Sequence, residues 1–183
     1  ASAARVAGRS SECSTRDMHV TIENLTKRYG SITAVDGVDI TAEDGQLTSL
    51  VGPSGCGKTT TLRSITGLER PDGGRISIGD EVVSDADRGL FRPTQERNVG
   101  FVFQTFDVWS HMTVFENVAF PLRIRDFTRE EIDDKVQNIL ELANIEELRE
   151  KNATDLSGGQ QARVGICRAL VYEPKVLLCD EPL

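Results

Sequence analysis

A glycine-rich stretch, GPSGCGKT at residues 52–59, carries the clearest chemical signal in the chain. It fits the pattern G-x-x-x-x-G-K-[ST], follows an apolar run and leads into the helix-compatible segment TTTLRSITGLE. Glycines at this spacing let backbone N–H groups converge on phosphate oxygens, and the helix N-terminus adds positive potential. Lys58 is expected to neutralise the β- and γ-phosphates, and the Thr59 hydroxyl to ligate Mg²⁺. The predicted phosphate-binding residues are Gly52, Pro53, Ser54, Gly55, Cys56, Gly57, Lys58, Thr59 and Thr60.

Two adjacent carboxylates close the apolar segment VLLCDE, residues 176–181. In proteins with such a phosphate loop, an aspartate at the end of a buried strand holds the magnesium ion. A neighbouring carboxylate then orients and deprotonates the attacking water. Asp180 is therefore predicted to be a metal ligand and Glu181 the catalytic base. An apolar run that ends in Asp-Glu is a weak pattern alone and becomes specific only downstream of Lys58.

A third motif, LSGGQ, begins at Leu156. Ser157 is suited to cap the helix that follows, and Gly158 and Gly159 leave the first amides open to a phosphate. A serine-glycine cap is common, but this helix start indicates a second anion-binding surface. We predict that Ser157, Gly158, Gly159 and Gln160 contact a nucleotide.

The elements around these motifs indicate an α/β layout with a helical subdomain. Alternating apolar residues predict strands within 19–30 and 35–45, and 71–83 is predicted to form a turn and a short hairpin. Three apolar runs, 47–51, 98–104 and 175–180, are predicted to be buried strands.

Helical periodicity dominates from about residue 105 to 172. Thr128 and Glu131 form a capping-box pattern ahead of one amphipathic helix, and a second helix is predicted from near Ser157 to about Tyr172, ended by Pro174. Residues 1–17 carry no such periodicity, and we expect a disordered leader or an upstream extension ahead of a domain at 18–183.

The composition is that of an ordinary globular chain of 183 residues. A net charge of −8 argues against a general affinity for nucleic acid. No stretch approaches the ~18 consecutive apolar residues of a membrane span, so any membrane role is expected to run through a partner. The four cysteines lack metal-binding or disulfide spacing and are predicted to be free thiols: Cys13, Cys56, Cys167 and Cys179.

Taken together, the motifs resemble those of the ATP-binding-cassette (ABC) ATPases, and the resemblance covers nearly everything after Met18. GPSGCGKTT is similar to the Walker A motif of that family, LSGGQ to its signature and VLLCDEP to its Walker B motif. Gln104 in FVFQ stands where the family has its Q-loop glutamine, which touches the metal and lies beside the contact with the membrane partner. Tyr29 in KRYG stands where the family has the aromatic residue that stacks on adenine. The resemblance implies a P-loop NTPase core with an antiparallel β subdomain and a helical signature subdomain.

The same resemblance implies ATP and Mg²⁺ as ligands and a head-to-tail dimer. Each ATP would lie between the Walker A motif of one subunit and the signature of the other, so Ser157 and Gly159 would serve the partner's nucleotide. Lys58, Gln104 and Glu181 would be the catalytic residues, and Thr59, Gln104 and Asp180 would hold the metal. Closure on ATP would drive transmembrane permease subunits, and the protein would lie in the cytoplasm against the inner face of the membrane.

The segment FVFQTFDVWSHMTVFENVAFPLRIR resembles the importer branch, whose members serve sugars, polyamines, ferric iron or inorganic anions. Residues 105–125 would form the groove that accepts the permease, with a solute-binding protein as an indirect partner. Ser110 replaces a usual proline, and 152–155 is an unusual sequence ahead of the signature, so docking details and substrate stay open.

Two other interpretations remain. A soluble ABC ATPase acting on the ribosome or on DNA would share the motifs, although the importer-like segment and the net charge disfavour it. In addition, the family has a D-loop and a switch histidine after Walker B, whereas only Pro182 and Leu183 follow Glu181. We therefore expect a cassette cut short at its C-terminal end, which binds ATP but turns it over poorly.

Overall fold

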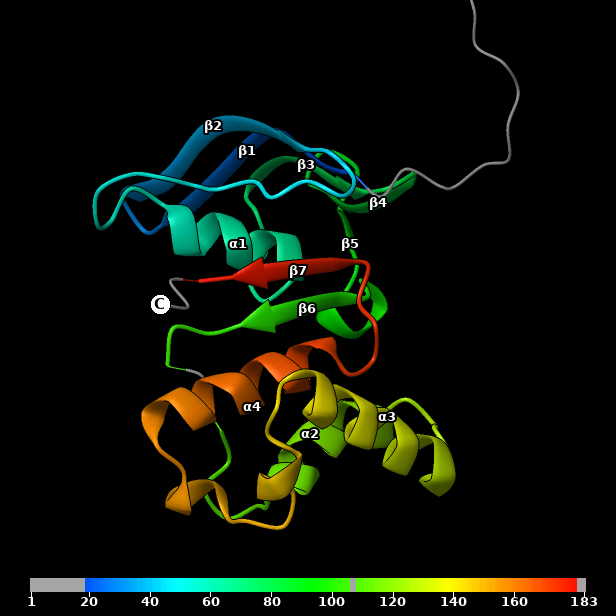
Figure 1. The fold of residues 1–183 in the computed structure, drawn as a ribbon. Coiled ribbons are helices and arrows are strands. Elements are labelled where there is room, and N and C mark those ends of the chain that lie inside the picture. The colour runs from blue at the N-terminus through cyan, green and yellow to red at the C-terminus, as the bar shows by residue number, and fades with distance from the viewer. Residues whose placement is uncertain (1–18, 106–107, 181–183) are drawn as a thin grey trace, which may run out of the picture.

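A computed structural model describes residues 19–105 and 108–180. Its larger sheet has five antiparallel strands in the order β2-β1-β3-β4-β5 (Figure 1). The strands are β1 (Val20–Tyr29), β2 (Ile32–Ala42), β3 (Gly73–Ile78), β4 (Glu81–Asp85) and β5 (Leu90–Phe91). The helices and the second sheet lie on one side of this sheet (Figure 1).

The antiparallel sheet follows the alternation in its sequence. Val20, Ile22 and Leu25 on β1 are buried, and β1 pairs with both β2 and β3. The turn between β3 and β4 uses Gly79 at φ +58, a conformation that glycine adopts without steric cost. The strand predicted within 19–30, the strand predicted within 35–45 and the hairpin at 71–83 are confirmed.

A second sheet consists of two parallel strands, β6 (Val99–Val102) and β7 (Val176–Cys179). Helix α1 (Lys58–Thr66) and helix α4 (Gly158–Leu170) lie on opposite sides of this pair (Figure 1). Gly100 lets α4 approach β6, because a Cβ at this position would lie 2.6 Å from the Ala169 carbonyl oxygen. The strand predicted at 98–104 is confirmed.

The remaining helices pack with α4 around a separate apolar cluster that includes Val118, Val136 and Val164. They are α2 (Val114–Arg123) and α3 (Arg129–Leu142), with the short 3-10 turns η2 (Glu146–Leu148) and η3 (Ala153–Asp155). A further 3-10 turn, η1 (Thr94–Glu96), lies between β5 and β6. Both predicted helices are confirmed, including the capping box in which Thr128 and Glu131 exchange hydrogen bonds. Among the described residues, no helix is both long enough and apolar enough to span a membrane.

Two strand predictions need correction. Residues 47–51 form no strand, and Leu47 and Val51 are 96% and 93% exposed. A buried parallel strand needs a neighbouring strand to bond and cover on both faces, and the β6–β7 pair takes up no third strand here. The strand β7 exists but is only half-buried, because Val176 and Leu178 pack into the core of the larger sheet while Leu177 is exposed. An edge strand buries alternate residues, so the expectation of full burial was wrong.

Candidate functional site

The glycine-rich loop lies just before α1 and is open to solvent: Gly52, Pro53, Ser54, Gly55 and Cys56 are exposed, and Gly57, Lys58, Thr59 and Thr60 are partly buried. Gly55 and Gly57 have φ of +82 and +96, which L side chains rarely adopt. A Cβ on Gly57 would also lie 2.5 Å from the carbonyl oxygen of Ala34 on β2. Glycine at 57 therefore lets the loop pack against the larger sheet, and α1 starts at once with its free N–H groups at the loop.

The Lys58 side chain folds back over this loop. Its ammonium donates hydrogen bonds to the carbonyl oxygens of Gly52 at 2.9 Å and Pro53 at 3.2 Å. These contacts hold a positive charge against the start of the loop predicted to bind phosphate.

Thr59 and Asp180 meet although 121 residues separate them in the sequence. The Thr59 hydroxyl donates to a carboxylate oxygen of Asp180 at 2.9 Å, and Asp180 is 7% exposed. The backbone N–H of Asp180 donates to Val102 at 3.0 Å, which fixes the residue to the end of β6. A hydroxyl and a carboxylate held this close are hard oxygen ligands of the kind that Mg²⁺ takes in a site shared with phosphates. The donor set therefore fits the ion.

Gln104 lies at the same edge of the small sheet. Because β6 and β7 are parallel, with Val102 paired to Cys179, their carboxyl ends point the same way. Asp180 directly follows β7, and Gln104 comes two residues after β6 and is exposed. The three predicted metal ligands thus gather at the carboxyl edge of the strands, which is where open α/β sheets bind ligands. The predicted catalytic base, Glu181, lies outside the described residues.

Tyr29 is at the end of β1 and is 46% exposed. Its backbone pairs with Ile32 at the start of β2, and the same strand carries Ala34, which Gly57 approaches. The ring lies 5.3 Å from the Lys27 ammonium. An exposed aromatic face on the hairpin beside the loop is suited to stacking.

The signature residues begin α4, on the other side of the β6–β7 pair from α1 (Figure 1). Ser157 and Gln160 form a capping box: the Ser157 N–H donates to the Gln160 side chain at 2.9 Å, and the Gln160 N–H donates to the Ser157 hydroxyl. A Cβ at Gly158 or Gly159 would meet nothing within 4 Å. The start of α4 is therefore fully capped, and among the described residues the space around its two glycines is free of neighbouring atoms. The fold does not bring it to the glycine-rich loop.

Three of the four cysteines are free, as predicted: Cys56, Cys167 and Cys179; Cys13 lies outside the described residues. Burial raises the pKa of Cys167 to about 11 and raises the pKa of Cys179. Both thiols are therefore protonated at neutral pH.

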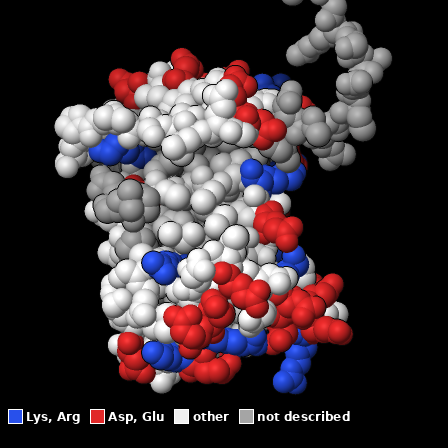
Figure 2. Space-filling view, viewed as in Figure 1, with Lys and Arg blue, Asp and Glu red and all other residues white. Residues whose placement is uncertain are grey.

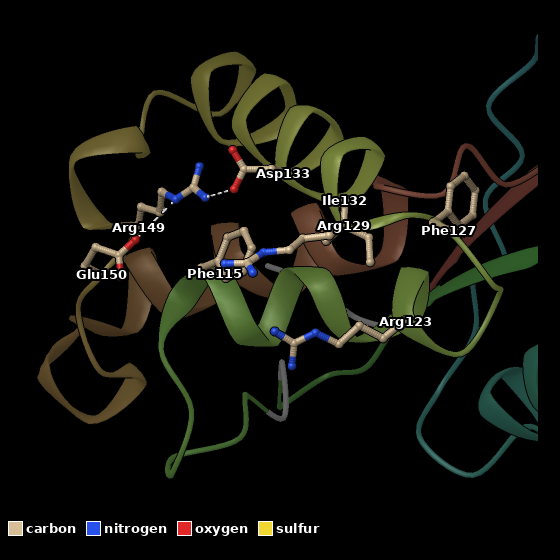
Figure 3. Close-up of a pocket in the computed structure, with 8 residues that line it drawn as sticks. All are labelled: Phe115, Arg123, Phe127, Arg129, Ile132, Asp133, Arg149 and Glu150. Carbon is tan, nitrogen blue, oxygen red and sulfur yellow. Dashed lines mark hydrogen bonds and ion pairs between the residues drawn. The ribbon is translucent and has the colours of Figure 1, made fainter.

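A cavity of about 610 Å³ lies in the helical region rather than at the loop (Figure 3). Arg149 lies over the ring of Phe115, 4.4 Å from its centre, and is paired with Asp133 and Glu150. Acidic side chains gather over the helical part of the face in Figure 2. None of the glycine-rich loop residues lines this cavity, so it is not the nucleotide site that the motifs predict.

Two buried polar residues were missed by the sequence interpretation. Asn117 on α2 organises the loop before it by bonding the backbone of Trp109 and Thr113. Arg97 is 2% exposed and bonds backbone carbonyls at the end of α1. In the sequence, both look like ordinary surface polar residues, and no local pattern marks them as buried.

Comparison with known proteins decides the family. A model of the family described as "ABC transporter" matches residues 35–183. The chain belongs to this family. The resemblance inferred from the motifs and the α/β fold class are therefore confirmed.

Curated relatives include the trehalose/maltose import ATP-binding protein MalK of Thermococcus litoralis, 46% identical over 90% of this chain and 44% of its own length. The sulfate/thiosulfate import ATP-binding protein CysA of Ralstonia nicotianae is 47% identical over 90% and 44%, and the Fe(3+) ions import ATP-binding protein FbpC of Brucella abortus is 46% identical over 90% and 45%. The chain thus spans a little under half the length of these relatives.

Solved structures give the same family. A dimeric bacterial ABC transporter cassette superposes with a TM-score of 0.77 at 34% identity, over 89% of this chain and 74% of that one. A post-hydrolysis dimer of the same cassette, bound to ADP and Pi, gives a TM-score of 0.76 at 34% identity, with the same coverage.

Proposed function

We propose that the full-length protein is the ATP-binding and ATP-hydrolysing subunit of an ABC importer. The observation that carries this proposal is the contact between Thr59 and Asp180 at 2.9 Å, beside a glycine-rich loop with a lysine folded over it. This contact joins a hydroxyl and a carboxylate from distant parts of the chain at one edge, as a magnesium-nucleotide site requires.

In this proposal, the loop residues and Lys58 bind the phosphates of ATP, and Tyr29 stacks on the adenine. Mg²⁺, when bound, neutralises the charge that develops on the phosphates, and Thr59, Gln104 and Asp180 hold it. Glu181 orients and deprotonates the attacking water. The domain would span 18–183, with its helical subdomain at about 105–172.

The proposed assembly has two such subunits head to tail. The open start of α4, with its glycines at 158 and 159 clear of neighbouring atoms, supports a role for Ser157, Gly158, Gly159 and Gln160 at a partner's nucleotide. The relatives named as import ATP-binding proteins support a role at a membrane permease on the cytoplasmic side, fed by a solute-binding protein. Those relatives serve different solutes, so the solute is left open.

The test is to replace Lys58 by alanine in the full-length protein and measure ATP affinity by calorimetry and solute uptake in cells. Loss of a charged group that contacts phosphate costs about 3 kcal/mol, which is roughly a hundredfold in Kd. Uptake should fall with it. Lys151→Ala, at an exposed lysine in the helical region, is the matched control and should leave both unchanged.

Normal uptake by Lys58→Ala would contradict the proposal. Copurification of the wild-type protein with ribosomes or DNA instead of a permease would favour a soluble ABC ATPase.

A further inference from the structure

Helix α1 lies along the β6–β7 pair and is bonded to it near both ends (Figure 1). At its N-terminal end, Thr59 bonds Asp180, which follows β7. At its C-terminal end, carbonyl groups of the last turn accept hydrogen bonds from Arg97, which lies two residues before β6. The first bond belongs to the proposed metal site, and the second has no part in the function described so far.

Arg97 is a buried cation held by carbonyl groups. Its Nη1 donates to Ser64 at 2.7 Å and to Ile65 at 2.9 Å, and its Nε donates to Arg92 at 2.8 Å. The ring of Phe91 lies beneath the guanidinium, 4.9 Å from the ring centre. Burial lowers the pKa of Arg97 to about 10, so the group remains charged at neutral pH.

No carboxylate among the described residues pairs with this cation, and its Nη2 has no hydrogen-bond partner there. Burying a charge without a counter-ion is costly, and an apolar side chain would fill the same space at less cost. The compensation comes from α1, since a helix C-terminus carries a partial negative charge. Packing alone does not explain Arg97, because an apolar side chain would fill the space at less cost in free energy. Its hydrogen bonds instead fix the C-terminal end of α1.

Gly67 provides the room for this contact. It ends α1 with φ of +82, and its N–H bonds the Arg63 and Ser64 carbonyls. A Cβ at this position would lie 2.6 Å from Nε and 2.8 Å from Cζ of Arg97. Gly67 therefore allows Arg97 to reach the end of α1, and the contact depends on both residues.

The contact between Arg97 and α1 completes a ring of contacts that includes the proposed metal site. From Arg97 the chain enters β6, whose Val102 accepts a hydrogen bond from the N–H of Asp180 at 3.0 Å. From Ser64 the helix runs back to Thr59, which donates to Asp180. The helix of nine residues is a rod of about 13 Å, so an axial slip at one end appears in full at the other. A slip of about 1 Å would break the hydrogen bond between Thr59 and Asp180.

We propose that Arg97 is a positioning residue of the magnesium site: through Gly67 and the end of α1 it sets the distance between Thr59 and Asp180. This inference rests on the proposed function of the same site. It assigns the arginine an effect on Mg²⁺ use rather than on phosphate binding, because the glycine-rich loop keeps its own contacts through Gly57 and Lys58.

The experiment uses the full-length protein with Arg97→Met, Arg97→Lys and Gly67→Ala. ATP affinity is measured with and without Mg²⁺, alongside the melting temperature. Loss of a residue that supports metal ligands indirectly costs about tenfold in metal affinity at the low end. Arg97→Met should therefore raise the Mg²⁺ concentration for half-saturation about tenfold and leave ATP affinity in EDTA within about twofold, while Arg97→Lys should fall between it and wild type.

Two matched controls separate this effect from general damage. Arg75→Met removes an arginine from β3 whose side chain is 42% exposed, and Gly89→Ala adds a Cβ at φ +67 where nothing lies within 4 Å. Gly89→Ala also puts an alanine at a positive φ, as Gly67→Ala does, but it does not crowd Arg97. Both controls should keep the wild-type Mg²⁺ requirement.

A lower melting temperature with an unchanged Mg²⁺ requirement in all three variants would overturn the inference and leave Arg97 a packing residue. Failure of the wild-type protein to bind Mg-ATP would instead contradict the proposed function. Amide hydrogen exchange in nucleotide-free protein tests the inference independently of ATP. Arg97→Met should speed exchange across 61–63 near the start of α1, and faster exchange confined to 64–67 would contradict the inference.

Discussion

Helices α1 and α4 both begin beside glycines, but their first turns are built differently. Before α1, Gly57 adopts a left-handed conformation and has no side chain, so the first amides of the helix have no side-chain cap. Before α4, Ser157 and Gln160 cap the turn within the motif itself. Within 19–105 and 108–180, only the first start bonds a carboxylate from a distant part of the chain, through Thr59 and Asp180.

The difference separates two kinds of candidate anion site. The site at α1 is assembled by long-range contacts within one chain, so its residues depend on the whole fold. The site at α4 is complete as a local unit but lies on the far side of the β6–β7 pair from the glycine-rich loop (Figure 1). A surface of that kind acts when another molecule supplies the ligand, which is what the proposed head-to-tail dimer does.

The largest effect is expected from changing the carboxylate at the α1 site. Asp180→Asn keeps the shape and an oxygen that accepts from Thr59, but removes the charge that Mg²⁺ requires. We expect Mg²⁺ affinity in the presence of ATP to fall between about tenfold and a hundredfold, measured by titration of the full-length protein. Asp155→Asn, at an exposed aspartate ahead of α4, is the control. Equal losses in the two variants would mean that net charge rather than ligation is responsible.

A smaller effect, of a different kind, is expected at the α4 site. Ser157→Ala removes the cap and should cost about 1 kcal/mol of stability, which lowers the melting temperature by roughly 2–4 °C. ATP binding by the separate subunit should be unchanged, whereas Mg-ATP-dependent dimerisation, followed by light scattering, should weaken. Ser157→Asp restores a cap without a hydroxyl and should recover stability but not dimerisation. Weakened ATP binding by the monomeric Ser157→Ala protein would erase the distinction between the two sites.

The smallest effect concerns the other local cap, at α3. The Glu131 carboxylate accepts hydrogen bonds from the backbone N–H and the hydroxyl of Thr128, which lowers its pKa below the ordinary value of 4.5. Because the unfolded chain binds this proton more readily, the contribution to stability is present above pH 4.5 and is lost as the pH falls through the lower folded pKa. Glu131→Gln should therefore flatten the acid limb of the stability curve below pH 4.5, measured by thermal unfolding. The neighbouring Glu130→Gln should leave that limb steeper than Glu131→Gln does.

The sequence predicted best those features whose residues lie close together in the chain. The capping box at Thr128 was recognised because its partner Glu131 lies three residues away, and Ser157 was recognised as a helix cap, although its pairing with Gln160 was not predicted. The hairpin at 71–83 was recognised because its turn glycine lies between alternating residues. The glycine-rich loop and Asp180 were recognised by motif, although their contact depends on the strands between them.

The sequence interpretation failed where the burial of a residue depends on contacts with distant parts of the chain. The run at 47–51 is apolar enough for a buried strand, but burial depends on whether a sheet offers an edge, which no local pattern encodes. Arg97 follows a charged residue, Glu96, and precedes a polar one, Asn98, so its burial becomes intelligible only through the approach of Gly67, thirty positions earlier. Glu181 remains a prediction from the motif.

The most direct test of the central claim is a double-mutant cycle between Thr59 and Asp180 in the full-length protein. Thr59→Val, Asp180→Asn and the double variant are compared with wild type for ATP affinity in Mg²⁺ and in EDTA. If the two residues share one magnesium ion, the losses in Mg²⁺ will be strongly non-additive, so the double variant binds about as weakly as Asp180→Asn alone, and the coupling will vanish in EDTA. Additive losses, or equal coupling in EDTA, would contradict the claim that Thr59 and Asp180 form a magnesium-nucleotide site.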